Sequence, residues 1–190
     1  GGLGIAFPTI DHALEFVTDC INGVGLSPEK DVSLAIDVAS TQFFDGTNYN
    51  LAALNKKFSS GEFISFISKM VSDHPVLSIE DPFAEDDWQS WTQFMTMAPS
   101  KLQVLGDDLF TTNLARLQRG IDEKSANAIL IKANQNGLVT STQKVLTTAQ
   151  ANNFKTVVSA RSGETEDSWL ADLATGWRAS QIKVGSTHGA

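Results

Sequence analysis

Short apolar runs recur along the chain, and each leads into polar or charged residues. The run Val76–Ile79 meets Glu80 and Asp81, and Pro82 then rules out continuation as a central strand or a helix. A run of this length suits a strand that is buried on both faces. The residues at the ends of the six predicted strands are Asp37, Glu80, Asp107, Lys132, Ala160 and Lys183. The pattern therefore predicts an acid or a base at nearly every strand end.

Apolar residues at helical spacing separate the predicted strands. Ser59 and Glu62 form a capping-box pattern ahead of one helix, and Thr140 with Gln143 forms a similar pattern ahead of another. Residues 41–57 are rich in Asn, Gly and Asp, which predicts a loop with a short hairpin around Asp45-Gly46. The predicted helices cover residues 10–20, 63–71, 87–97, 113–124, 140–151 and 166–178.

This alternation of strands and helices predicts an α/β fold with a parallel sheet. Successive strand ends lie roughly 23 to 43 positions apart, which suits repeated strand–helix units. An open doubly wound sheet and a closed barrel both fit, but functional groups at the same end of six strands favour a TIM-type (β/α) barrel. Because a complete barrel has eight strands and about 250 residues, we expect residues 1–190 to be the C-terminal part of a larger protein.

The charge and the cysteine content of the chain argue against some classes of function and indicate a cellular compartment. The chain has 22 acidic and 14 basic residues, and its net charge of −8 argues against nucleic-acid and anionic-membrane binding. The single cysteine, Cys20, cannot form an internal disulfide, and its place in an apolar-periodic segment predicts a core thiol. A reducing, cytoplasmic compartment fits. The three histidines, His12, His74 and His188, are expected on the surface.

The strand-end acids suggest a metal site. Asp37, Glu80 and Asp107 end three consecutive predicted strands, so their carboxylates are expected to converge. Three close carboxylates repel one another unless a cation neutralises them, and an all-oxygen set suits Mg²⁺. Each acid taken alone has a simpler interpretation, as a helix cap or as the partner of a base.

Basic residues follow at the later strand ends. Lys132 is either an ion-pair partner of the acids or a base activated by burial and nearby cations. Arg161 and Ser162 after the next strand, and Lys183 after the last, add donors for a carboxylate or a phosphate group. Such a site suits removal of a proton α to a carboxylate, with metal ions stabilising the enediolate.

Five motifs with their spacing resemble enolase (phosphopyruvate hydratase), and the likeness covers nearly the whole chain. They are Ser78–Phe83, Gly106–Leu109, Ile131–Gln135, Ser162–Asp167 and Gln181–Lys183. The resemblance implies a cytoplasmic, glycolytic lyase that dehydrates 2-phosphoglycerate to phosphoenolpyruvate, works as a homodimer and has an N-terminal domain that this sequence lacks. It implies Mg²⁺ on Asp37, Glu80 and Asp107, catalytic lysines at Lys132 and Lys183, with Lys132 as the base, and substrate binding by Lys132, Arg161, Ser162 and Lys183.

Three positions depart from the family pattern. Ala160 stands where enolases have a histidine, Leu3 stands at the position of a glutamate that helps to expel the hydroxyl group, and Asn136 replaces an apolar residue. Losing a general acid costs roughly 10²- to 10⁴-fold in rate. Two hypotheses follow: a lyase for 2-phosphoglycerate or a related phospho- or phosphonocarboxylic acid, and a catalytically impaired scaffold or binding protein.

Overall fold

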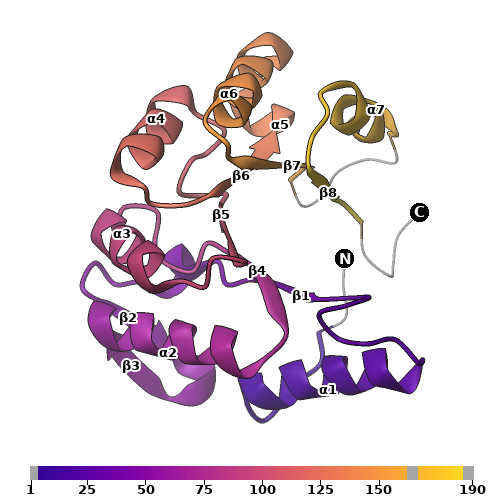
Figure 1. The fold of residues 1–190 in the computed structure, drawn as a ribbon. Helices are drawn as coiled ribbons and strands as arrows, with labels where there is room; N and C mark the ends of the chain where they lie inside the picture. Colours follow the sequence, from indigo (N-terminus) through magenta and orange to yellow (C-terminus); the bar gives the residue numbers. More distant parts are fainter. Residues whose placement is uncertain (1–3, 162–166, 186–190) are drawn as a thin grey trace. The chain divides into compact units, whose positions relative to one another are not determined.

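The computed structural model describes residues 4–161 and 167–185. It consists of two compact units, an N-terminal unit over Ile5–Val104 and a C-terminal unit that begins at Leu105. The division falls within strand β5 (Gln103–Gly106). Figure 1 labels the helices and strands of both units.

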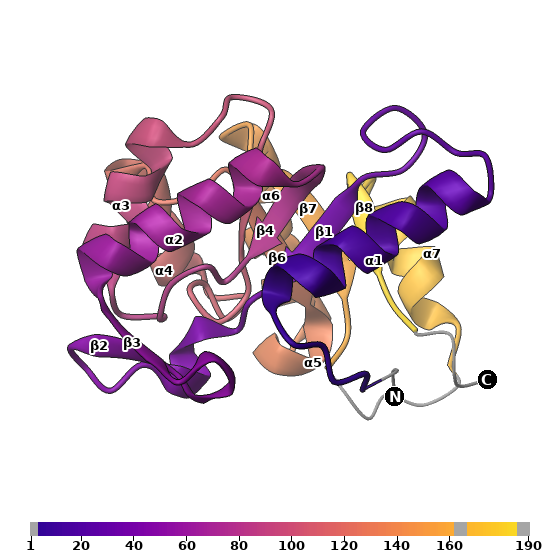
Figure 2. The same ribbon diagram turned by 90° about the horizontal axis from the view of Figure 1, so that it is seen from below.

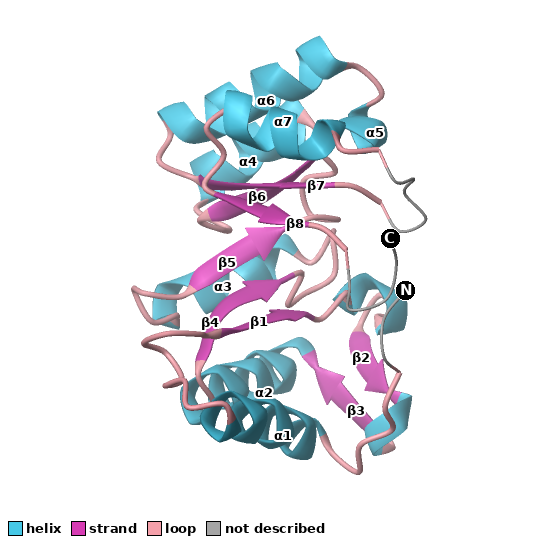
Figure 3. Ribbon diagram, turned by 90° about the vertical axis from the view of Figure 1, so that its right-hand side faces the viewer, coloured by secondary structure: helices cyan, strands magenta, loops and turns pink. Residues whose placement is uncertain are grey.

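The N-terminal unit is built on two parallel strands, β1 (Leu34–Asp37) and β4 (Val76–Glu80). Helices α1 (Ile10–Gly23) and α2 (Ser60–Asp73) lie on the same side of these strands (Figure 3). Helix α3 (Trp88–Met97) follows β4 and packs against α2. The strand register places Asp37 opposite Glu80, so the two predicted strand ends lie next to each other.

An antiparallel hairpin precedes α2. Strands β2 (Asn48–Leu51) and β3 (Lys56–Ser59) are joined through η2 (Ala52–Leu54). The turn predicted at Asp45-Gly46 is confirmed, because an antiparallel bridge joins Phe44 to Tyr49 and the Asp45 amide donates to the Asn48 carbonyl over 3.0 Å. The Asp45 carboxylate also accepts hydrogen bonds from the Thr47 and Asn48 amides. The β2–β3 hairpin adds a second turn, which was not predicted, where Asn55 adopts a left-handed conformation (φ 49°). The short helix η1 (Ser40–Phe43) lies between β1 and this hairpin.

The start of α2 confirms the predicted capping box. The Ser59 hydroxyl accepts from the Glu62 amide, and the Glu62 carboxylate accepts from the Ser59 amide. Figure 2 shows the β2–β3 hairpin beside this end of the helix. Tyr49 of β2 is fully buried, and its ring stacks on Phe63 with 4.2 Å between centroids. The apolar face of α2 is thus fixed at its first turn. Its buried residues are Phe63, Ile64, Ile67, Met70 and Val71.

The C-terminal unit repeats one strand–helix pattern. Its strands are parallel, and β5 pairs with β6, β6 with β7, and β7 with β8. Helices α4, α6 and α7 lie on the same side of β6 and β7 in Figures 1 and 3. The elements are α4 (Leu114–Glu123), β6 (Ala128–Lys132), α5 (Ala133–Asn136), α6 (Val139–Ala151), β7 (Lys155–Ser159), α7 (Trp169–Gly176) and β8 (Gln181–Lys183).

Phe110 explains two glycines of this unit. A Cβ atom at Gly106 would lie 2.6 Å from the Phe110 ring, and one at Gly120 would lie 2.3 Å from it. Atoms cannot approach this closely, so the fully buried ring requires glycine on both β5 and α4. Phe110 therefore sets the spacing between the strand and the helix that follows it.

All six predicted strands are confirmed, but several details differ from prediction. Helix α6 begins at Val139 without a side-chain cap, so the cap predicted from Thr140 was wrong. Helix α7 begins at Trp169. Cys20 is exposed, because the buried side chain of α1 is Ile21. Among the described residues, no helix combines the length and the apolar character needed to cross a membrane.

Candidate active site

The acids of the N-terminal unit lie at adjacent strand ends. Asp37 ends β1, Glu80 ends β4, and the two are register partners. The Val38 amide donates to the Glu80 carbonyl oxygen over 2.9 Å, which extends the pairing by one residue. Glu80 is only 4% exposed, whereas Asp37 is exposed. The two side chains therefore offer one buried and one accessible carboxylate.

The turn after Glu80 is held by η1. Asp81 takes a left-handed conformation (φ 42°), and its carbonyl accepts from the Ser40 amide over 3.2 Å. The buried Ser40 hydroxyl donates to the Pro82 carbonyl over 2.9 Å. A non-glycine residue in this conformation costs of the order of 1–3 kcal/mol and persists only where neighbouring contacts hold it. The two bonds from Ser40 supply that restraint.

A buried tyrosine anchors the next part of the same loop. The Tyr49 hydroxyl accepts from the Ala84 amide over 3.1 Å and donates to the Asp87 carboxylate over 2.7 Å. Burial raises the pKa of the Tyr49 phenol, and the adjacent Asp87 carboxylate adds to this shift. The hydroxyl therefore stays protonated and remains a donor. The hairpin thus fixes the loop that follows Glu80.

The C-terminal unit contains a buried ion pair between two predicted site residues. Lys132 Nζ lies 2.5 Å from Asp107 Oδ2, and both side chains are 12% exposed. Lys132 ends β6 and Asp107 follows β5, so their backbone positions are set by the parallel β5–β6 pairing. Of the two interpretations of Lys132, the ion-pair partner is confirmed, and its role as a base stays a prediction.

Two further residues surround this ion pair, and the sequence reasoning did not assign them. Gln135 Nε2 donates to Asp107 Oδ1 over 3.4 Å, and the fully buried Thr112 hydroxyl donates to Gln135 Oε1 over 2.8 Å. Gln135 belongs to the motif Ile131–Gln135, which was the available signal. Thr112 carried no such signal, because its contact depends on a loop that brings it back to β6.

That loop is strained. Thr111 and Thr112 both adopt left-handed conformations, with φ 48° and 49°. β-branched residues are rare there. The Thr111 amide donates to the Asp107 carbonyl over 2.7 Å, which closes the turn directly after the acid. The turn carries Thr112 back toward Lys132, whose amide donates to its hydroxyl over 3.0 Å.

The remaining predicted residues follow β7 and β8. Lys183 is the register partner of Ser159, and its carbonyl accepts from the Ser159 hydroxyl over 2.7 Å. Lys183 and Arg161 are exposed, and Ala160 is half-buried. Ser162 and Leu3 lie outside the described residues. The structure therefore brings together Asp37 with Glu80 in one unit and Asp107 with Lys132 in the other.

The donor set is compatible with a hard cation. The three predicted metal ligands offer carboxylate oxygens only, which suit Mg²⁺ better than a soft transition metal. The single cysteine lies on α1 and does not belong to this set. The residues present thus fit the metal that the sequence analysis predicted.

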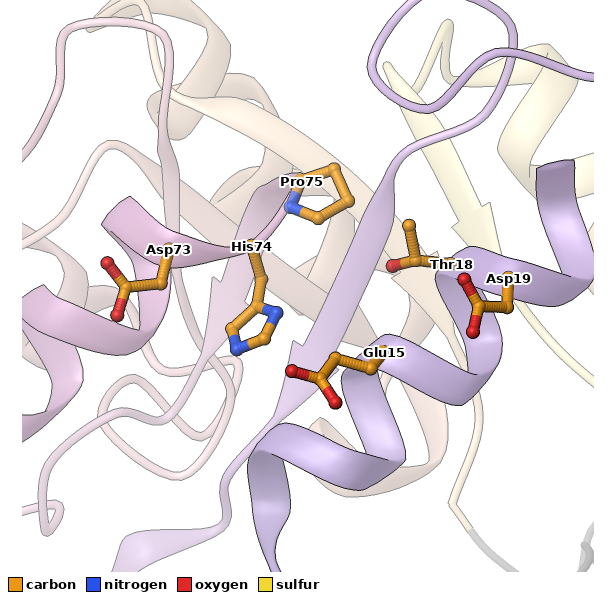
Figure 4. Close-up of a pocket in the computed structure, with 6 residues that line it drawn as sticks. All are labelled: Glu15, Thr18, Asp19, Asp73, His74 and Pro75. Carbon is orange, nitrogen blue, oxygen red and sulfur yellow. The ribbon is translucent and has the colours of Figure 1, made fainter.

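A separate hollow lies in the N-terminal unit, between α1 and the end of α2 (Figure 4). Its volume is about 340 Å³. The His74 side chain is only 9% exposed, and Nε2 lies 2.9 Å from Asp11 Oδ1, so the expectation of a surface histidine was wrong for His74. None of the predicted site residues lines this hollow. It is lined by Glu15, Thr18, Asp19, Asp73, His74 and Pro75.

Comparison with known protein families gives a match across nearly the whole chain. The family model described as "Enolase, C-terminal TIM barrel domain" matches residues 1–189. It agrees with the parallel strand–helix units described above, and it decides between the two predicted folds in favour of the barrel.

Proposed function

The chain belongs to the enolase family, and on this premise we propose that it acts as a Mg²⁺-dependent lyase. The proposed substrate is 2-phosphoglycerate, which would yield phosphoenolpyruvate, or a related phospho- or phosphonocarboxylic acid. The observation that carries the proposal is the buried ion pair of Lys132 with Asp107. A buried ionic pair in a domain of this family is a good candidate for chemistry, because holding charges away from water is costly without a function.

Asp37, Glu80 and Asp107 are the residues that would hold Mg²⁺. Bound Mg²⁺ supplies positive charge that stabilises the negative charge developing on the substrate carboxylate. The loop anchored by Ser40 and Tyr49 keeps the Glu80 end of β4 in place.

Lys132 is the proposed base: its ammonium group, charged in the ion pair with Asp107, gives one proton to solvent, and the amine then takes the proton α to the carboxylate. Asp107 fixes Nζ by direct contact, so the base approaches its substrate from a defined position. Lys183, Arg161 and Ser162 are proposed to bind the anionic groups of the substrate, since guanidinium and ammonium groups suit phosphate and carboxylate. Lys183 is proposed to assist catalysis through its charge.

Expulsion of the hydroxyl group is the weaker half of the mechanism. Ala160 offers a methyl group where the family has a histidine, and a methyl group cannot transfer a proton. This substitution favours a second candidate function, a scaffold that keeps the barrel and has lost turnover. The two candidates differ in metal binding, because only the enzyme needs its carboxylates to hold Mg²⁺.

The test uses the full chain with Mg²⁺ and a panel of acids related to 2-phosphoglycerate. The lyase is expected to form an enol product that absorbs in the ultraviolet, and Lys132→Ala should abolish it. Lys155→Ala is the matched control, since Lys155 is an exposed lysine at the start of β7. In calorimetry, micromolar Mg²⁺ binding that Glu80→Gln removes supports the enzyme. Absence of both product and Mg²⁺ binding would refute it in favour of the scaffold.

A further inference from the structure

A closed ring of hydrogen bonds joins Lys132 to Asp107 by two routes. The direct route is the contact of Lys132 Nζ with Asp107 Oδ2 at 2.5 Å. The second route starts at the Lys132 amide, which donates to Thr112 Oγ1 over 3.0 Å, and continues from Thr112 to Gln135 Oε1 over 2.8 Å. Gln135 Nε2 then reaches Asp107 Oδ1 over 3.4 Å. Both oxygens of the carboxylate are thus held.

The direction of the hydrogen bonds follows from the shorter contacts. The Thr112 hydroxyl accepts the Lys132 amide hydrogen, and its own hydrogen has its nearer acceptor in Gln135 Oε1 at 2.8 Å, compared with 3.5 Å to the Leu130 carbonyl. This choice turns the NH₂ group of Gln135 toward Asp107. A valine at position 112 would keep the shape of threonine but remove all three hydrogen bonds of the hydroxyl, so the Gln135 amide would lose its fixed orientation.

Asn136 supports the ring from outside. Its Nδ2 donates to the Thr112 carbonyl over 2.9 Å. Thr112 is the residue whose backbone is left-handed, with φ 49°. This is the position where the sequence departs from the apolar residue of the family pattern. The hydrogen bond gives that departure a structural role, because it ties the loop after β5 to the short helix α5 after β6.

We propose that Thr112, Gln135 and Asn136 are positioning residues, which hold the proposed base Lys132 and the proposed metal ligand Asp107 in a fixed mutual orientation. The inference rests on the proposed function. None of the three takes part in proton transfer itself. Removing a residue that orients a metal ligand typically lowers metal affinity or activity 10- to 100-fold.

The test compares Thr112→Val with Thr112→Ser in the full chain. Three quantities are measured: hydrogen exchange of the Lys132 amide, Mg²⁺ affinity by calorimetry, and exchange of the substrate's α proton for deuterium. Thr112→Val is expected to speed exchange of the Lys132 amide at least about fivefold, as fits the loss of one hydrogen bond. It should also weaken Mg²⁺ binding or lower kcat about 10- to 100-fold with little change in KM.

Matched variants separate positioning from general damage to the fold. Thr112→Ser keeps the hydroxyl and should restore all three quantities to near those of the unmodified chain. The Ile131 amide, on the fully buried part of β6, should exchange at an unchanged rate in every variant. If Thr112→Val does not fold, Gln135→Leu tests the same ring from its other side. Asn136→Leu should show the same effects at smaller size.

The outcomes distinguish this inference from the proposed function. An unmodified chain with no α-proton exchange refutes the proposed function, and the exchange rate of the Lys132 amide still decides whether the ring exists. If Thr112→Val and Gln135→Leu leave the amide, the Mg²⁺ affinity and kcat unchanged, the positioning role is refuted. Equal loss in Thr112→Val and Thr112→Ser would also refute it, because the hydroxyl would then not be the cause.

Discussion

Breaking the Lys132–Asp107 ion pair is expected to destabilise the folded protein strongly. The two charged groups are 2.5 Å apart, and both side chains are 12% exposed. Lys132→Met leaves the Asp107 carboxylate in this largely dry place without the lysine charge. Losing one partner of a buried pair costs about 3–5 kcal/mol in the free energy of unfolding. Asp107→Asn should have a similar effect, because it strands the ammonium group instead.

The double variant isolates the interaction. Because Lys132→Met and Asp107→Asn remove the same contact, their combined cost should fall short of the sum by about 0.5–3 kcal/mol. Urea unfolding followed by circular dichroism, without divalent cations, gives the four free energies of the cycle. The control is Lys101→Met, because Lys101 pairs with Glu29 at 2.9 Å but the two side chains are 61% and 53% exposed. Its cost should stay below about 1 kcal/mol.

Additive costs would refute this reasoning. If the double variant equals the sum of the single variants within about 0.5 kcal/mol, the two charges do not stabilise each other. If Lys132→Met is as stable as Lys101→Met, the Lys132–Asp107 pair is not buried as the structure indicates. In either case the ion pair could no longer support the proposed role of Lys132.

Three further predictions concern the scaffold around the site. Tyr49→Phe should lower the free energy of unfolding by about 1–3 kcal/mol in urea titrations, because it leaves buried partners of the hydroxyl unsatisfied; an unchanged midpoint would contradict the anchoring role. Hydrogen bonds from the Ser59 side chain and backbone hold the pKa of Glu62 below its ordinary value. The stability this adds is therefore full above the unfolded-state pKa of about 4.3 and is lost as pH falls through the lower folded-state pKa. Ser59→Ala should reduce that acid-dependent part of the unfolding curve, whereas Ser65→Ala, with its hydroxyl on the Gly61 carbonyl, should not. In thermal melts, Gly120→Ala should lower the free energy of unfolding by about 1–3 kcal/mol, because the new Cβ atom clashes with Phe110. Gly61→Ala, with open space around it, should be neutral or stabilising in the same assay.

Much of the fold could be predicted because the parallel strands are short and end at polar residues. Strands β5, β6 and β7 are buried at nearly every position, which leaves continuous apolar runs. Strands β1 and β4 are partly exposed, so the expectation of burial on both faces was wrong there, but their ends at Asp37 and Glu80 agree with the structure. The capping box at Ser59 was equally readable, because it depends on residues only three positions apart.

The details that failed depend on contacts between distant residues. The turn at Asp45-Gly46 was predicted, but the β2–β3 hairpin that follows it was not, because it is held in part by packing of Tyr49 on Phe63. Helical spacing located α1 but did not show which side of the helix is buried. Cys20 was therefore predicted in the core, whereas it is exposed. His74 is covered because Asp11, 63 positions earlier in the chain, reaches it.

The candidate site also combines residues that could be predicted from local motifs with residues that depend on distant contacts. The type of each strand-end residue could be recognised from its motif, and Lys132 and Asp107 do meet. The residues that hold them were not predicted. Thr112 reaches Lys132 only through two consecutive left-handed residues, and threonine gives no sequence signal for that conformation.

The central claim is that Lys132 removes the proton α to a carboxylate. It is tested most directly by incubating the full chain with Mg²⁺ and phosphoglycerate-like acids in D₂O and following the α proton by NMR. This exchange needs no departure of the hydroxyl group, so Ala160 does not obscure it. We predict α-proton exchange in the unmodified chain, its loss in Lys132→Ala and its retention in Lys155→Ala. Exchange that persists in Lys132→Ala, or is absent with every acid in the unmodified chain, would contradict the account.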